Sequence, residues 1–144
     1  MKEEDKFWEF VDRVNFTSNI YNEIFIDFDD IMLSMAKFYS IEDLKLFDYI
    51  YQTKYHESYN RFKKLWLSEG EPLGVSDDGY TDLISSVVGL GKNFYYSITD
   101  EGLINMANDN YYRENFGYLF HSLDRDKFIE KYNKQRRIHK LESL

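Results

Sequence analysis

The sequence contains no cysteine and only one proline. The absence of cysteine excludes a disulfide framework and thiolate chemistry, and it suits a reducing cytoplasm. No stretch approaches the roughly 20 consecutive apolar residues that a bilayer-spanning helix needs. The opening segment MKEEDKFWEF is charged and lacks the apolar core of a signal peptide. These absences predict a soluble cytoplasmic protein.

Disorder is not expected, because aromatic residues make up 19% of the 144 residues. This length fits a single domain spanning residues 1–144. The net charge of −8 is unevenly placed. Residues 1–124 carry 11 basic and 23 acidic side chains, whereas residues 125–144 carry 7 basic and 3 acidic ones. The body is therefore expected to attract a basic partner and repel nucleic acid.

Helical periodicity dominates the chain. Apolar residues recur at helical spacing over residues 20–39, where Phe28, Ile31, Met32, Met35 and Phe38 are among the residues expected on one inward stripe, and again over residues 44–66. Ser40 is placed to cap the second helix, and Gly70 and Pro72 are placed to stop it. This second pattern indicates either one helix of some seven turns or two helices sharing an axis.

The segment EPLGVSDDGYTDLISSVVGLG, residues 71–91, looks most like a site. Ser76 is a natural N-cap, and Asp77 and Asp78 would lie in the first turn, where negative charge meets the positive end of the helix dipole. Gly89 and Gly91 would each cost about 1 kcal/mol relative to alanine inside a helix. We therefore expect either a close approach by another helix or a break near Gly91.

Further helices are expected after Thr99, over about residues 111–123, and over about residues 124–142, where the chain is basic. The residues expected to face inward are Tyr112, Phe116, Leu119, Phe120 and Leu123 in the second of these helices and Phe128, Ile129, Tyr132 and Ile138 in the third. Alternation typical of strands is weak and lies within longer helical periods. The predicted fold class is all-α, a single-domain bundle of about six or seven helices. The basic C-terminal helix is interpreted as a solvated helix in preference to an RNA-binding one.

Diagnostic patterns for metal binding or catalysis are missing. The three histidines, His56, His121 and His139, are far apart, and the aspartates at 77, 78 and 82 lack the spacing of a calcium loop. The glycines at 89 and 91 do not form the dinucleotide fingerprint. We therefore predict no catalytic residue, no metal site, no cofactor and no enzyme activity.

Tyrosine is abundant, with 13 residues. Tyr51, Tyr55 and Tyr59 align along one face of the long predicted helix, whereas Tyr49 points elsewhere. Most tyrosines are expected to be core residues with their hydroxyls at the rim. Tyrosine is also enriched in protein interfaces. The predicted partner-binding residues are Glu69, Glu71, Asp77, Asp78, Asp82, Tyr111 and Tyr112.

The chain resembles an uncharacterised family of mostly bacterial helical domains. The matching pieces are FWEFVD at 7–12, SIEDLKLFDYIY at 40–51, LW at 65–66 and SDDGYTDL at 76–83. The resemblance covers roughly residues 6–106 and departs where Ser86 replaces the family's tryptophan. It implies a helical fold and carries no known reaction.

Three functions are consistent with these patterns. The first is an immunity protein that neutralises a bacterial toxin, with a nuclease as one candidate, by covering its basic active site. The second is a small-ligand or cation-binding domain, or an enzyme, that uses the SDDG segment. The third is a regulatory adaptor whose basic tail binds nucleic acid. The oligomeric state cannot be read from the sequence.

Overall fold

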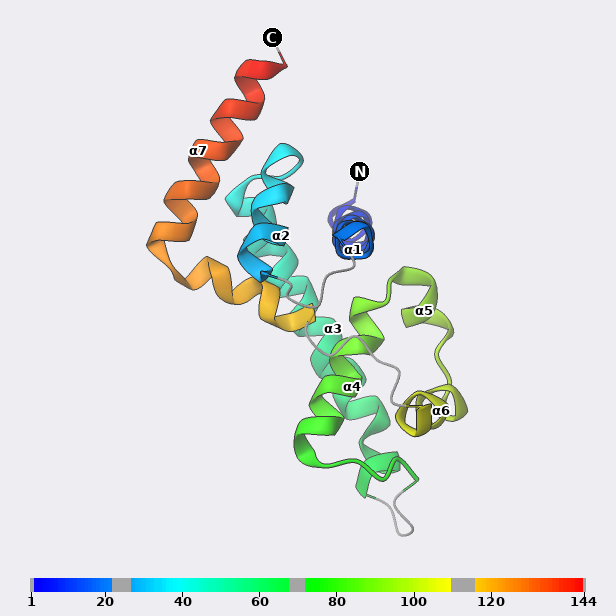
Figure 1. Ribbon diagram of the computed structural model, residues 1–144. Helices are drawn as coiled ribbons and strands as arrows, with labels where there is room; N and C mark the ends of the chain where they lie inside the picture. Colours follow the sequence, from blue (N-terminus) through cyan, green and yellow to red (C-terminus); the bar gives the residue numbers. More distant parts are fainter. Residues whose placement is uncertain (1, 22–26, 68–71, 110–115, 144) are drawn as a thin grey trace. The chain divides into compact units, whose positions relative to one another are not determined.

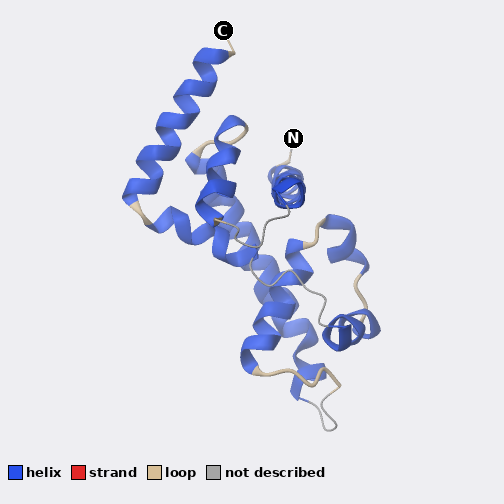
Figure 2. Ribbon diagram, in the orientation of Figure 1, coloured by secondary structure: helices blue, strands red, loops and turns tan. Residues whose placement is uncertain are grey.

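The computed structural model describes residues 2–21, 27–67, 72–109 and 116–143. Within these ranges Figure 2 shows helices and loops and no strand, which confirms the predicted all-α fold class. In the same ranges no helix is both long and apolar enough to cross a membrane. The helices, shown in Figure 1, are α1 (Glu3–Tyr21), α2 (Phe28–Ser34), the 3-10 helix η1 (Met35–Lys37), α3 (Ile41–Leu67), α4 (Asp77–Gly89), α5 (Lys92–Ser97), α6 (Asp100–Asp109), the 3-10 helix η2 (Phe116–Asp124) and α7 (Asp126–Glu142).

The chain divides into two compact units. Unit 1 consists of Met1–Ile50 and Tyr118–Leu144, and unit 2 consists of Tyr51–Gly117. Helix α3 therefore supplies its first ten residues to unit 1 and the remainder to unit 2. The single domain over residues 1–144 stays a prediction.

Unit 1 is built around aromatic side chains from α1, α3 and η2. The ring of Phe10 stacks on that of Phe47 at a centroid distance of 4.9 Å and lies 5.8 Å from that of Phe120. Helix α1 was not among the predicted helices, although it carries a regular apolar stripe. The residues of that stripe are all buried: Phe7, Phe10, Val11 and Val14.

The stripe predicted over residues 20–39 ends before its last member. Ile31, Met32 and Met35 are buried as expected. By contrast, Phe38 is 40% exposed and its neighbour Tyr39 is buried, so the prediction of Phe38 on the inward face is wrong. The helical turns end at Lys37, so Phe38 and Tyr39 lie beyond the helical repeat, and the ring of Tyr39 turns inward to pack against those of Phe10 and Phe47. Residues 22–26 of the predicted stripe lie outside the described residues.

Helix α3 is one continuous helix of 27 residues, which confirms the first of the two predicted alternatives. Ser40 caps it as expected. Its hydroxyl accepts a hydrogen bond from the Asp43 backbone N–H at 3.1 Å, and the Asp43 carboxylate accepts one from the Ser40 N–H at 3.0 Å. This reciprocal pair satisfies two backbone donors at the helix start. Gly70 lies outside the described residues, and Pro72 is in a turn.

The chain from residue 116 onward differs from expectation in two respects. Residues 116–124 form a 3-10 helix where an α-helix was predicted, although the expected inward residues are buried: Phe116, Leu119, Phe120 and Leu123. In α7, Phe128 and Tyr132 are buried as predicted. Ile138 is 39% exposed, so its assignment to the buried side is wrong. The burial of α7 is greatest near its first turns, where it packs against α2 and η1.

Two hydrogen bonds hold α7 on η1. The Tyr132 hydroxyl donates to the Tyr39 carbonyl at 2.7 Å, and the Arg136 guanidinium donates to the Ala36 carbonyl at 3.0 Å. Both acceptors are carbonyls at or just after the end of the 3-10 turn, where helical partners run out. The side of α7 that carries Tyr132 and Arg136 is therefore its attached side.

The two glycines near the end of α4 are explained by both predicted causes. A Cβ at Gly89 would lie 2.8 Å from Cβ of Phe116, so this position is a close approach between α4 and η2. Gly91 has φ 112°, a conformation that favours glycine, and it separates α4 from α5. Tyr95, predicted on the α4 stripe, consequently belongs to α5.

Candidate functional site

The loop that precedes α4 is held in place by contacts with α3 and with the core of unit 2. The Trp66 indole N–H donates to the Val75 carbonyl at 3.2 Å, and Leu73 is buried in the core of unit 2. The Ser76 hydroxyl accepts a hydrogen bond from the Gly79 N–H at 3.1 Å, which confirms the predicted N-cap. The loop thus presents the start of α4 at a fixed place on unit 2.

Helix α4 is pinned to the second half of α3 by one tyrosine. The ring of Tyr80 is stacked on that of Trp66 at a centroid distance of 4.6 Å and an interplanar angle of 5°. Its hydroxyl donates to the Tyr59 carbonyl at 2.6 Å, and its ring packs edge-on against that of Tyr59 at 4.9 Å. Burial raises the pKa of Tyr80 well above its usual range.

Three aspartates define what we call the acidic face of α4: Asp77, Asp78 and Asp82. Asp77 and Asp78 are exposed in the first turn, and Asp82 is partly buried one turn later. Asp82 follows Asp78 by four residues, so the two lie on the same side of the helix. Negative charge in the first turn of α4 also favours the helix, because it meets the positive end of the dipole.

The acidic face lies beside half-buried tyrosines of α3. Burial, together with the nearby charges of Tyr59 and Asp82, raises the pKa of Tyr55. Tyr55 and Tyr59 are both partly exposed, with ring centroids 6.2 Å apart. An acidic patch therefore adjoins aromatic surface, a combination suited to protein recognition.

The tyrosines of α3 follow the predicted pattern. Tyr51 is buried, Tyr55 and Tyr59 are intermediate, and Tyr49 is 70% exposed on another side of the helix. Tyr55 and Tyr59 were not among the predicted partner-binding residues. Tyr55 and Tyr59 are four residues apart and therefore lie on the same face of one helix. This spacing is the signal in the sequence that could have identified them.

Four of the seven predicted partner-binding residues cannot be placed. Glu69, Glu71, Tyr111 and Tyr112 lie outside the described residues. Asp77, Asp78 and Asp82 come from one helix, and their grouping follows from helical spacing. Across the described ranges, no group of three or more histidine, aspartate or glutamate side chains could hold a metal ion.

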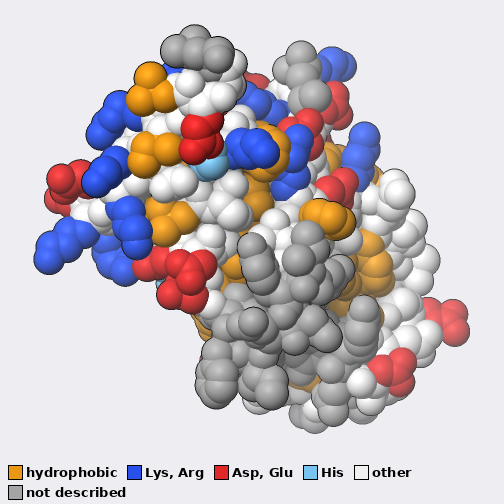
Figure 3. Space-filling model, turned by 45° about the horizontal axis from the view of Figure 1, so that its top comes forward, with side chains coloured by type: hydrophobic (Ala, Val, Ile, Leu, Met, Phe, Trp, Pro, Cys, Tyr) orange, Lys and Arg blue, Asp and Glu red, His pale blue; other side chains and the backbone are white. Residues whose placement is uncertain are grey.

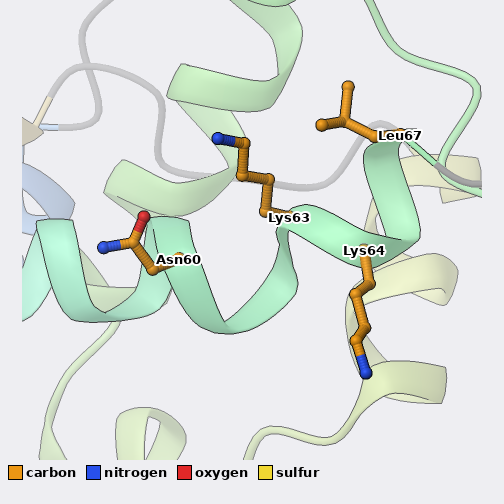
Figure 4. Close-up of a pocket in the computed structure, with 4 residues that line it drawn as sticks. All are labelled: Asn60, Lys63, Lys64 and Leu67. Atoms are coloured by element: carbon orange, nitrogen blue, oxygen red, sulfur yellow. The ribbon is translucent and has the colours of Figure 1, made fainter.

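An open depression lies near the C-terminal end of α3, lined by Asn60, Lys63, Lys64 and Leu67. Figure 4 shows that the side chains of Lys63 and Lys64 extend in different directions. Their ammonium groups therefore do not converge on one point, as they would in a site built for a small anion.

A second charged surface lies on α7. Lys and Arg side chains gather over this helix at the left of Figure 3, with hydrophobic side chains between them. Lys127, Lys131, Lys134, Arg137 and Lys140 are all exposed. The opposite side of α7, which carries Tyr132 and Arg136, is attached to η1.

Comparison with protein-family models, with curated proteins and with solved structures gives no match for this chain. The resemblance to the uncharacterised family of bacterial helical domains therefore stays a prediction.

Proposed function

We propose that this protein is an acidic protein-binding domain that neutralises a bacterial toxin in the cytoplasm. In this proposal the acidic face of α4 and the adjoining ring of Tyr55 contact a basic surface of the toxin. The observation that carries the proposal is the presentation of three carboxylates on a helix that Tyr80 and Trp66 hold firmly against α3.

The class of toxin follows from the charge. Carboxylates spaced along a helix can occupy the places of phosphate groups in a site that binds nucleic acid, so a nuclease with a basic active site is the expected target. A fixed acidic patch also accelerates encounter with a basic partner by electrostatic steering. Rigid presentation matters because less conformational entropy is then lost on binding.

Tyrosine supplies the contact area that charge alone does not. Exposed charge pairs at the rim of an interface contribute little affinity, whereas aromatic side chains near its centre often contribute much. Tyr55 is half-buried and adjoins Asp82, so its exposed edge can be covered by a partner without first being ordered.

The test begins with recovery of the partner. The tagged protein is used at low salt to capture proteins from its host, and a basic protein bound in a one-to-one ratio is then purified and titrated by calorimetry. The test variant is Asp77→Asn/Asp78→Asn/Asp82→Asn. If each lost charge weakens binding by about 0.5 kcal/mol, the dissociation constant rises about tenfold.

The matched control is Asp100→Asn/Glu101→Gln/Asp109→Asn in α6. It removes the same charge, and Asp100 and Glu101 occupy a first helical turn as Asp77 and Asp78 do. We expect the control to bind like the wild type, and the partner to have toxic activity that the wild-type protein suppresses. Equal weakening by both triple variants, or a bound partner without toxic activity, would refute the proposal.

A further inference from the structure

The exposed flank of α7 has the spacing of a helix-pairing face. Lys127, Lys131, Lys134, Ile138 and Leu141 follow one another at alternating intervals of four and three residues. This spacing places all five on one narrow stripe along the helix. All five are exposed, with Ile138 at 39% and Leu141 at 69%. We name this stripe the α7 flank: three lysines followed by two aliphatic residues.

Helix α1 carries a complementary stripe on its outer side. Asp5, Glu9, Asp12 and Phe16 are separated by four, three and four residues. Asp5 and Asp12 are exposed, and Phe16 is 67% exposed. Glu9 is partly exposed and accepts hydrogen bonds within the chain from the Tyr39 hydroxyl at 2.7 Å and from the Arg13 guanidinium at 3.4 Å, so Asp5 and Asp12 are the carboxylates that we place against a partner. We name this stripe the α1 flank: three carboxylates followed by one aromatic residue. In both flanks the charged residues come first and the apolar residues follow, and the charges of the two flanks are opposite in sign.

The match has a definite direction. When the two helices run parallel, Asp5 faces Lys127, Asp12 faces Lys134, and Phe16 faces Ile138. Each stripe spans 11 residues between its first charge and this apolar position, about 16 Å along a helix axis, so the register is kept along the whole contact. An antiparallel arrangement would instead place Phe16 against Lys127 and Asp5 against Ile138.

Within one copy, the helices that carry the two flanks lie on different sides of α2 (Figure 1). Helix α2 packs against both α1 and α7. Figure 1 shows α1 end-on and α7 lengthwise, on different sides of α2. From this charge complementarity we infer that the α7 flank of one copy pairs with the α1 flank of a second copy. A two-fold axis would let this contact occur twice in one dimer.

The dimer is expected to be weak and concentration-dependent. Each chain carries a net charge of −8, so two copies repel each other at long range, and the local pairs must exceed this repulsion. The apolar ends matter for the same reason, because Phe16 and Ile138 gain from burial whatever the salt concentration. The two flanks share no residue with the acidic face of α4, so the inference stands apart from the proposed function.

The experiment is sedimentation velocity on the full chain from micromolar to submillimolar concentration, with two charge reversals. Lys127→Glu/Lys134→Glu makes the α7 flank acidic, and Asp5→Lys/Asp12→Lys makes the α1 flank basic. Each reversal alone places like charges opposite each other. We expect each to raise the dimer dissociation constant at least tenfold, with an unchanged helical circular dichroism spectrum.

The decisive sample is an equimolar mixture of the two reversal variants. In a mixed dimer the acidic α7 flank meets the basic α1 flank, and the remaining wild-type flanks also match. We therefore expect the mixture to dimerise as the wild type does, although neither variant does so alone. Lys63→Glu/Lys64→Glu and Glu101→Lys/Asp109→Lys change the net charge equally at exposed positions elsewhere, and they should leave the dimer intact.

Several results would overturn the inference. The wild-type chain could stay monomeric at every concentration, or both reversals could leave the dimer dissociation constant unchanged. The mixture of the two variants could also fail to form a dimer. A larger species that disappears on nuclease treatment would assign the α7 flank to nucleic acid instead.

Discussion

Gly89 offers the sharpest test of the packing in unit 2. In the substitution Gly89→Ala, the new Cβ would lie 2.8 Å from Cβ and 2.9 Å from Cγ of Phe116. Carbon atoms in contact prefer about 3.5–4.0 Å, so one of the two residues must move by more than half an ångström. Neither contacting atom is the far end of a flexible side chain.

Phe116 has little room to withdraw. Its ring lies 5.6 Å from that of Tyr51, whose hydroxyl donates a buried hydrogen bond to the Ser85 hydroxyl at 2.9 Å. A Cβ on the next residue, Gly117, would lie 2.6 Å from the Tyr51 hydroxyl. Displacing Phe116 therefore disturbs a second tight contact.

The magnitude follows from two opposing effects. Overpacking of this kind costs about 1–3 kcal/mol, whereas replacing glycine by alanine within a helix gains at most about 1 kcal/mol. Because Gly89 is the last residue of α4, the gain is smaller than in a helix interior. We expect Gly89→Ala to lower the free energy of unfolding by about 1–2 kcal/mol.

The assay is equilibrium unfolding in urea, followed by helical circular dichroism. With a slope of about 2 kcal/mol per molar urea, the midpoint should fall by about 0.5–1 M. The control is Gly102→Ala in α6, where the nearest atom is the terminal methyl of Ile98 at 3.0 Å, which can turn away. Its midpoint should stay close to that of the wild type. A midpoint that rises for Gly89→Ala would refute the reasoning.

Two further predictions concern hydrogen-bonded side chains. Tyr80→Phe removes the donor to the Tyr59 carbonyl and keeps the ring stack. It should lower the free energy of unfolding by about 1 kcal/mol, measured by the same urea assay. An unchanged urea midpoint would contradict the structural role of this bond. In unit 1, Arg125 and the Ser122 hydroxyl bind the Asp29 carboxylate and lower its pKa. A carboxyl group whose pKa is lowered on folding stabilises the protein above the unfolded pKa of about 3.9, and this contribution is lost as the pH falls through the folded value. The difference in urea midpoint between the wild type and Asp29→Asn should therefore be largest above pH 5 and shrink below about pH 4; a constant difference down to pH 3 would contradict this.

Local signals in the sequence predicted much of the fold. Helix starts were readable because a capping side chain and its backbone partner lie three residues apart, as with Ser40, Ser76 and Thr99. Buried faces were readable because helical periodicity is strict, as in the stripe of α4. The burial of Tyr39 in place of Phe38 was not readable, because Tyr39 lies beyond the last helical turn and is placed by contacts of its ring with Phe10 and Phe47.

The candidate site was only partly accessible to sequence reasoning. The aspartates at 77, 78 and 82 stand out because they precede and enter a capped helix. Their neighbour Tyr55 could not be assigned to them, because the pairing of α3 with α4 is made by the stack of Tyr80 on Trp66, 14 residues apart in sequence. Sequence periodicity identifies a face but not the element that it meets.

The order of the chain has a consequence for the completion of each unit. Unit 2 is one continuous segment, whereas unit 1 needs both the first fifty residues and the segment after Gly117. The bonds from Ser122 to Asp29, Tyr132 to Tyr39 and Arg136 to Ala36 join residues 93, 93 and 100 positions apart. During synthesis all residues of unit 2 have left the ribosome's active site before the closing partners of unit 1 exist. The N-terminal part of unit 1 therefore stays incomplete until α7 is translated, because the Tyr39 and Ala36 carbonyls lack their α7 donors until then.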